Sequence, residues 1–312
     1  MLIVRYARVS CPDVQVGIRQ DDGTLSPLPV ESIAALLECP MDQIRSIVAE
    51  ATRQTVRIDD TVSPLPPIDG ATEVWASGVT YQRSREGRTE ESSQPTIYDD
   101  VYDAERPELF FKSVAWRVVG DGDPIGIRAD SAQNVPEPEL AVVANSGGEI
   151  VGYTVCNDVS SRSLEGSNPL YLPQAKIYAG ACAIGPGIRP VWELEDHRRL
   201  AIAVRVCRGD NVVWSGRTSV GQMRRNVEEL LSALYVADQF PQGVVLSTGT
   251  GLVPELSFGL CPDDGVQITI DKVGMLSNHV VRGVAPFENL WNRVSQETHQ
   301  DRSDPRSPES GK

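Results

Sequence analysis

The sequence predicts an α+β protein that is mainly β, in which a small N-terminal α/β domain precedes a larger domain. Three observations lead to this prediction. The 312 residues suffice for one domain of roughly 200–250 residues and a small appendage. Helix-like segments occur before residue 70, and strand-like segments separated by turn residues dominate after it. A proline-rich segment at residues 62–67 separates the two patterns, so we place a boundary near residue 70.

The first 70 residues are expected to form the small domain. Proline does not fit inside a helix, so Pro40 should separate two short amphipathic helices. Residues 62–67 should then form a stiff, extended link to the rest of the chain. The expected elements are strands at 2–9 and 14–19 and helices at Ser32–Glu38 and Met41–Ala51.

The larger domain is expected to span residues 71–292 and to consist mostly of strands. One long helix is expected from Val220 to about Ala237, because apolar residues recur there at steps of three and four after Ser219, a suitable N-cap. The tail at 293–312 has no apolar face, so we expect it to be disordered. The expected strands are 73–79, 109–112, 125–128, 138–144, 150–156, 181–184, 201–207, 211–214, 243–247, 266–270 and 280–283.

Composition argues against several classes of function. Asp and Glu outnumber Lys and Arg by 43 to 29, and a net charge of −14 does not suit a protein that binds a nucleic-acid backbone. No apolar run approaches the roughly 20 residues of a membrane span, and the N-terminus lacks the features of a signal peptide. No two of the six cysteines stand at Cys-x-x-Cys spacing, which favours reduced thiols in the core. We therefore expect a cytoplasmic protein with neither a nucleic-acid nor a membrane partner.

Histidine is scarce in this chain. Only His197, His279 and His299 are present, which argues against a histidine-rich zinc site. A chain with many carboxylates and little imidazole, if it binds a catalytic metal, is expected to bind a hard cation through oxygen.

Two glutamates at the start of a predicted strand indicate where such a cation would bind. Glu137 and Glu139 are two residues apart, so their side chains lie on the same face of the strand. The strand reaches a turn at 145–148 and returns, which would bring Asp158 near Glu137 on the partner strand. A shift of one residue in register would reverse the face of Asp158, so the pattern permits this convergence without requiring it.

Three carboxylates held together should raise one another's pKa values unless a cation lies among them. Three carboxylates and water molecules suit Mg²⁺, Mn²⁺ or Ca²⁺. An ordinary exposed hairpin with acidic ends is the alternative interpretation of the same spacing.

The sequence around these carboxylates resembles that of the fumarylacetoacetate hydrolase family. The resemblance covers about residues 72–285, and its motifs occur in the family's order. They are Gly78 and Tyr81, Glu137-Pro138-Glu139-Leu140-Ala141, Gly152 to Arg162 with Asn157-Asp158-Val159-Ser160, Lys176 before an apolar strand that ends at Gly185-Pro186, and Thr248-Gly249-Thr250.

This resemblance implies a mixed β-roll that binds Mg²⁺ or Mn²⁺. It makes Glu137, Glu139 and Asp158 the metal ligands and places Lys176 beside the substrate. Arg162 matches a family arginine that either contacts substrate or holds Asp158. The implied substrates are acids with a 2-keto or enolisable diketo group, which the metal polarises as a Lewis acid. A homodimer or homotetramer is likewise expected by resemblance.

One departure from the family pattern bears on the reaction. Many hydrolytic members carry a His-Glu pair that activates water, and here Ser84 and Gly87 stand at those two positions. His279, which follows Ser277-Asn278 in a turn-like stretch, is the remaining candidate for a substitute base. The loss of the pair argues against hydrolysis of a carbon–carbon bond.

Residues 102–112 and 168–180 resemble one subgroup of the family, the 2-keto-3-deoxy-D-arabinonate dehydratases, which also carry Ser-Arg in place of the histidine. The implied reaction removes water from a 2-keto-3-deoxy sugar acid and yields 2,5-dioxopentanoate. A family hydrolase or isomerase that acts on a diketo or 2-keto acid is the alternative. A binding protein without catalytic activity is a third possibility, against which the complete set of carboxylates and the lysine argue.

The same resemblance implies roles for the remaining residues. Glu108 and Lys176 match the pair that acts as base and acid, in an order that the motifs leave open, and a lysine enclosed near a metal should have a depressed pKa. Ser84 and Arg85 are candidates for binding substrate hydroxyl and carboxylate groups. Thr250, in a glycine-flanked loop, is a candidate carboxylate anchor. The structural alternatives are surface cations for Arg85 and Lys176, a strand-end carboxylate for Glu108 and a turn residue for Thr250.

Overall fold

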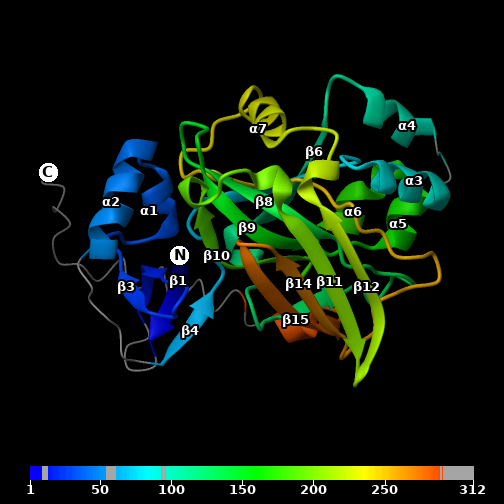
Figure 1. Cartoon of the computed structure of the whole chain (residues 1–312). Helices are drawn as coiled ribbons and strands as arrows, with labels where there is room; N and C mark the ends of the chain where they lie inside the picture. Colours follow the sequence, from blue (N-terminus) through cyan, green and yellow to red (C-terminus); the bar gives the residue numbers. More distant parts are fainter. Residues whose placement is uncertain (9–12, 54–60, 93, 95, 289, 291–312) are drawn as a thin grey trace, which may run out of the picture.

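The computed structural model describes residues 1–8, 13–53, 61–92, 94, 96–288 and 290 (Figure 1). The strands are β1 Leu2–Arg8, β2 Val14–Arg19, β3 Leu25–Pro27, β4 Val62–Leu65, β5 Glu73–Gly78, β6 Glu108–Val114, β7 Pro124–Ile127, β8 Pro138–Ala144, β9 Ile150–Asp158, β10 Cys182–Pro190, β11 Ala201–Arg208, β12 Asn211–Ser219, β13 Val244–Ser247, β14 Gly265–Ile270 and β15 Gly274–Arg282. The α-helices are α1 Ile33–Leu37, α2 Met41–Arg53, α3 Gln82–Glu91, α4 Thr96–Asp103, α5 Arg162–Ser167, α6 Leu172–Lys176 and α7 Val227–Tyr235.

These strands form two mixed sheets that share a core. The larger sheet has the order β3-β2-β1-β10-β9-β8-β13-β5-β6, with β4 paired to β1, and the smaller has the order β12-β11-β14-β15-β7. Most neighbours are antiparallel, whereas β13 with β5 and β15 with β7 are parallel. The predicted α+β, mainly β class with a mixed β-roll is therefore confirmed.

Strand β8 is buried on both faces, which explains its unbroken apolar run. Leu140 and Val142 belong to the apolar cluster that the two sheets share. Ala141 and Val143 face the opposite way, into a second cluster that includes residues of α1 and α2. When both faces of a strand are covered, its sequence is a continuous apolar run and does not alternate between apolar and polar residues.

The N-terminal strands and helices lie where the sequence predicts them, with one correction. The segment expected to be a stiff, extended link is extended, but it is also a strand, β4, which pairs antiparallel with β1. Strand β1 also pairs with β10, with Ile3 opposite Ile188, so the N-terminal strands extend the sheet of the larger domain. The division into domains at 1–70 and 71–292 stays a prediction. The tail at 293–312, expected to be disordered, lies outside the described residues.

The long helix expected over Val220–Ala237 is wrong in its first half. A single 3-10 turn at Val220–Gln222 is followed by an extended stretch, and α7 begins only after Asn226. The physical reason is tertiary: Met223 forms a β-bridge with Tyr81, and the Arg224 N–H donates to the Thr80 carbonyl at 2.9 Å. The apolar residues of this segment are thus buried by the chain entering α3, and a continuous helix is not needed to bury them.

A second correction concerns His279. The stretch Ser277-Asn278-His279 is not a turn but part of β15, and the His279 side chain is exposed. Helices α3 to α6, which the strand pattern did not predict, lie together beside one end of the larger sheet (Figure 1). They surround the carboxyl end of β9 and the residues that lead into β8.

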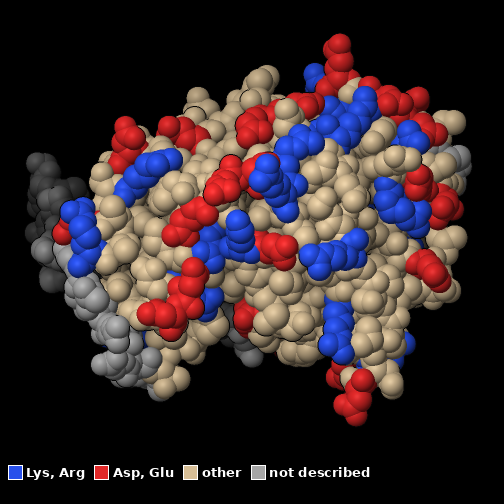
Figure 2. Space-filling model, in the orientation of Figure 1, with Lys and Arg blue, Asp and Glu red and all other residues tan. Residues whose placement is uncertain are grey.

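Charged side chains of both signs are interspersed over the face shown in Figure 2. Several of them form local pairs, such as Arg224 with Asp103 at 2.6 Å. The net charge is therefore not gathered into one patch on this face. The five described cysteines are free thiols, with Cys156 and Cys182 buried. Among the described helices, none is long and apolar enough to cross a membrane.

Candidate active site

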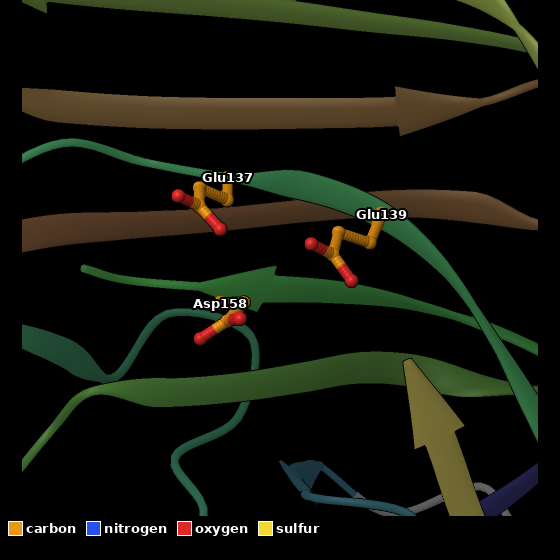
Figure 3. Close-up of side chains that lie close together, drawn as sticks. All are labelled: Glu137, Glu139 and Asp158. Carbon is orange, nitrogen blue, oxygen red and sulfur yellow. The ribbon is translucent and has the colours of Figure 1, made fainter. Parts of the chain in front are cut away.

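The two central strands β8 and β9 bring three carboxylates together (Figure 3). The hairpin pairs Glu139 with Cys156, and the Asp158 N–H donates to the Glu137 carbonyl at 3.0 Å. This register places Glu137, Glu139 and Asp158 on one face, with ligand oxygens all within 4.8 Å of one another. All three side chains are buried, so the alternative of an exposed acidic hairpin is excluded and the predicted convergence is confirmed.

Glu139 is held from the loop after β13. Its Oε2 accepts hydrogen bonds from the Ser247 hydroxyl at 2.6 Å and from the Gly249 N–H at 2.8 Å. Gly249 has a φ of +90°, and a Cβ there would lie 2.1 Å from the Thr80 hydroxyl oxygen, so only glycine fits. Burial, together with the Asp158 and Glu137 carboxylates, raises the pKa of Glu139 well above its ordinary value.

Glu137 behaves differently because two cations contact it. Its Oε2 accepts from Lys176 Nζ at 2.5 Å, and its Oε1 pairs with the Arg88 guanidinium at 2.6 Å. Burial alone would raise the pKa of Glu137, but Lys176 and Arg88 outweigh it and lower that pKa to about 2. The carboxylates were expected to raise one another's pKa values unless a cation lies among them; the pKa of Glu139 is raised, and that of Glu137, beside two cations, is lowered.

Lys176 ends helix α6 and reaches into the carboxylate cluster. Its Nζ donates to Glu137 Oε2, to Asp158 Oδ2 at 3.0 Å and to the Ser160 hydroxyl at 2.6 Å. Only 2% of Lys176 is exposed, so it is not a surface cation. Burial by itself lowers its pKa, but the surrounding carboxylates, Asp158 first, raise it above the ordinary lysine value. The depressed pKa was expected for a lysine beside a bound divalent metal, and for that state it stays a prediction.

Glu108 opens β6 and lines the same cavity as the carboxylates and Lys176. About 350 Å³ of space, part of it open to solvent, lies between the lining side chains. Burial, followed by the nearby Glu165 carboxylate, raises the pKa of Glu108 to about 7. Gly78 lies opposite Glu108 in the β5–β6 pairing, and a Cβ at Gly78 would lie 2.1 Å from Glu108 Oε2. The absence of a side chain at position 78 therefore makes room for the Glu108 carboxylate.

Helix α3 presents Ser84 and Arg88 to the cavity, but not Arg85. Ser84 Oγ donates to the Tyr81 carbonyl at 2.7 Å and accepts from the Tyr81 N–H at 3.1 Å, so it caps the helix as well as lining the cavity. Arg85 instead lies over the Tyr102 ring, 4.9 Å from its centroid, and pairs with Asp99 at 3.5 Å. Arg88, one turn after Ser84, pairs with Glu137 inside the cavity.

Thr250 lines this cavity and a smaller one beside it, and Arg162 lines only the smaller one. Thr250 Oγ1 donates to the Pro138 carbonyl at 3.0 Å and accepts from the Leu252 N–H at 3.1 Å. Arg162 donates to the carbonyls of Pro254 and Glu255, each at 3.0 Å, and so holds the segment that forms the wall of the smaller cavity.

Sequence reasoning missed three charged residues of this site: Lys112, Arg88 and Glu165. Lys112 and Glu165 are buried, and Arg88 pairs with both Glu165 and Glu137. A usable signal was present for two of them. Arg88 stands four residues after Ser84 in a stretch of good helix formers, which puts both on one helix face. Lys112 is one of only four lysines among 29 basic residues.

The donor set suits a hard divalent cation. Three buried carboxylates offer oxygen ligands, and none of the described histidines lines either cavity. Oxygen-only sites with several carboxylates are typical of Mg²⁺, Mn²⁺ and Ca²⁺. The residues present therefore fit Mg²⁺.

Comparison with known proteins identifies the family. The family model described as fumarylacetoacetate (FAA) hydrolase C-terminal matches residues 74–281. The chain belongs to the fumarylacetoacetate hydrolase family. Within the family it is 46% identical over 251 residues to a probable 2-keto-3-deoxyxylonate dehydratase of Haloferax volcanii, covering 80% of this chain and 85% of that protein. It is 42% identical over 266 residues to the 2-dehydro-3-deoxy-D-arabinonate dehydratase of Saccharolobus solfataricus, covering 82% and 89%.

A solved structure of this family is also similar over most of the chain. It is a 2-keto-3-deoxy-D-arabinonate dehydratase complexed with magnesium and 2,5-dioxopentanoate. The TM-score is 0.77 at 36% identity, and the match covers 91% of this chain and 99% of that one. The family resemblance inferred from the motifs is thus confirmed.

Proposed function

We propose that this member of the fumarylacetoacetate hydrolase family is a Mg²⁺-dependent dehydratase that converts 2-dehydro-3-deoxy-D-arabinonate to 2,5-dioxopentanoate. The observation that carries the proposal is a cavity in which Lys176 and Glu108 line the space around a buried carboxylate triad, with none of the described histidines nearby. The similarity to two sugar-acid dehydratases, over most of each chain, supports the choice of substrate.

Glu137, Glu139 and Asp158 would hold the metal. When bound, Mg²⁺ supplies Lewis-acid chemistry that makes the carbon next to the 2-keto group more acidic. Elimination of water then needs a base for a proton on C3 and an acid for the departing hydroxyl. Glu108 and Lys176 are the two proton-transfer groups of this cavity. A carboxyl group whose pKa is about 7 is present in both forms at neutral pH, which suits transfer in either direction.

Ser84 and Arg88 would orient the substrate. The Ser84 hydroxyl hydrogen is used on the Tyr81 carbonyl, so Ser84 Oγ offers a substrate hydroxyl an acceptor and not a donor. Arg88 would take the role expected of Arg85, because it is the arginine of α3 whose positive charge lies in the cavity. Thr250 and the segment held by Arg162 form the opposite wall of the site.

A substrate screen tests the proposal. Five- and six-carbon 2-keto-3-deoxy acids are incubated with the protein and Mg²⁺ or Mn²⁺, and products are identified by mass spectrometry. We expect 2,5-dioxopentanoate from the arabinonate derivative, without loss of carbon, and no turnover in EDTA. Release of pyruvate from a diketo acid, with no dehydration of any sugar acid, would instead establish a family hydrolase.

Proton exchange separates the two catalytic roles. In D₂O, the variant that lacks the acid still exchanges the C3 hydrogen of the substrate, whereas the variant that lacks the base does not. Glu108→Gln and Lys176→Met are compared by NMR of recovered substrate. Exchange in both variants would show that neither residue is the base.

We also propose that the protein is a cytoplasmic homodimer or homotetramer. Exposed apolar side chains support self-association, among them Leu170, which is 84% exposed, and its neighbour Tyr171. Size-exclusion chromatography with light scattering tests this, and a monomer at micromolar concentration would contradict it.

A further inference from the structure

Strand β6 contacts Lys176 at several points along its length. Glu108, Phe110 and Lys112 follow one another at steps of two residues on this strand. Glu108 lines the cavity with Lys176, and the Phe110 ring centroid lies 5.6 Å from Lys176 Nζ. Lys112 Nζ donates to the backbone carbonyl of Lys176 at 2.6 Å. The strand that carries one proton-transfer group therefore also supports the other.

A bulge gives Lys112 its direction. Phe111 pairs with Trp75 of β5, and Ser113 pairs with the adjacent residue, Val74. Lys112, between Phe111 and Ser113, therefore has no partner on β5. A bulge of this kind redirects the side chain of the extra residue. Only 1% of Lys112 is exposed, so its ammonium group lies inside the protein.

The buried ammonium group of Lys112 has three partners. It forms an ion pair with Asp158 Oδ1 and donates hydrogen bonds to the carbonyls of Lys176 and, at 3.3 Å, Val159. Two hydrogen bonds and a counter-charge compensate for the loss of water around this buried charge. These contacts join Lys112 to both Asp158 and the backbone of Lys176.

The effect on the carboxylate cluster is specific. One oxygen of each carboxylate has a partner outside the cluster: Asp158 Oδ1 forms an ion pair with Lys112, Glu137 Oε1 pairs with Arg88, and Glu139 Oε2 accepts from Ser247 and Gly249. The second oxygens of Asp158 and Glu137 both accept from Lys176 Nζ. Lys112 and Lys176 thus contact different oxygens of Asp158 and together set the orientation of its carboxylate.

We propose that Lys112 is a positioning residue, which holds Asp158 with one oxygen turned inward and fixes the backbone of Lys176 so that its ammonium group reaches the substrate. The first part rests on the carboxylate triad alone, and the second rests on the proposed dehydration. The chain uses lysine at only four positions, and two of these four residues meet at this site. A compact ammonium group fits this enclosed position, whereas the larger planar guanidinium group would not reproduce the same two hydrogen bonds and ion pair.

Three variants test the proposal. Lys112→Met removes the charge at similar length, Lys112→Arg keeps the charge but changes its shape, and Lys272→Met is the matched control in the exposed turn between β14 and β15. Folding is checked by circular dichroism with saturating Mg²⁺. We expect Lys112→Met to lose at least about 100-fold in kcat with KM within about threefold, because small misplacements of a catalytic group have effects of that size. Lys112→Arg should stay below about a tenth of wild-type kcat, and the control should match wild type.

Two readouts do not depend on turnover. Calorimetry with Mg²⁺ alone should show weaker binding to Lys112→Met than to wild type, because the carboxylate of Asp158 is no longer held in its orientation toward the site. Labelling with an amine reagent, followed by mass spectrometry, should show Lys176 reacting at least about tenfold faster in Lys112→Met. If the wild type does not dehydrate any sugar acid, the proposed function fails while these two readouts still decide the positioning role.

Other outcomes overturn the inference. Wild-type kcat in Lys112→Arg would show that only the positive charge at position 112 matters and that its shape does not position other groups. Wild-type Mg²⁺ affinity in Lys112→Met would show that Lys112 does not position Asp158. An unchanged labelling rate at Lys176 would show that its backbone does not depend on Lys112.

Discussion

Glu108→Gln should change the pH dependence of stability in a defined direction. The cavity raises the pKa of Glu108 from an ordinary 4.5 to about 7, chiefly by burial and then by the Glu165 carboxylate. A folded-state pKa above the unfolded value means that the native protein holds this proton more tightly. The stabilising contribution is therefore fully present below pH 4.5 and is lost as the pH rises through 7. Glutamine has a similar shape and does not ionise, so the variant escapes this loss.

The magnitude follows from the same two pKa values. Each pKa unit corresponds to 1.36 kcal/mol, so the wild type should lose about 2 to 3 kcal/mol relative to Glu108→Gln between pH 5 and pH 8. Urea unfolding in EDTA at several pH values, for both proteins, measures the difference. The comparison at pH 5, where Glu108 is mostly protonated in the folded protein, is the internal control for changes unrelated to charge. Parallel stability profiles across this range would refute the reasoning.

Three further predictions concern catalysis. Glu139→Gln removes one charged ligand and should weaken Mg²⁺ binding by at least about tenfold in calorimetry, with loss of turnover; unchanged affinity would remove the metal site assigned to this triad. Lys176→Met should keep Mg²⁺ binding and lower kcat by about 100-fold or more, and normal turnover would exclude its role in proton transfer. Gly78→Ala places a Cβ 2.1 Å from Glu108 Oε2 and should lower kcat by about tenfold with native circular dichroism; wild-type kinetics would show that the position of this carboxylate is not critical.

The fold and the carboxylate cluster follow from short-range patterns. Glu137 and Glu139 share a face because strands have a period of two, and the turn at 145–148 sets the length of the hairpin that returns to Asp158. Apolar runs locate most of the strands, although β3 and β4 were not predicted as strands and most of β15 was not expected to be a strand. Such patterns contain the information needed because they depend on neighbours along the chain.

The rest of the site depends on contacts between distant segments. Lys112 reaches Asp158 only because a bulge forms between β5 and β6, and no local pattern marks that bulge. The choice of Arg88 over Arg85 depends on where α3 packs, and the short α7 depends on the bridge between Met223 and Tyr81. The pKa of Lys176 likewise depends on the carboxylates of Asp158, Glu137 and Glu165, which come from three different segments of the chain.

The balance of charge in the carboxylate cluster has a consequence for how the protein is assembled. Glu137, Glu139 and Asp158 are accompanied by Lys112, Lys176 and Arg88, three negative groups with three positive ones. Many structural metal sites form only when the ion is present, because their ligands repel one another without it. Here the chain supplies its own counter-charges. We therefore expect the chain to fold without the ion, and a chelator to remove Mg²⁺ reversibly without unfolding the protein.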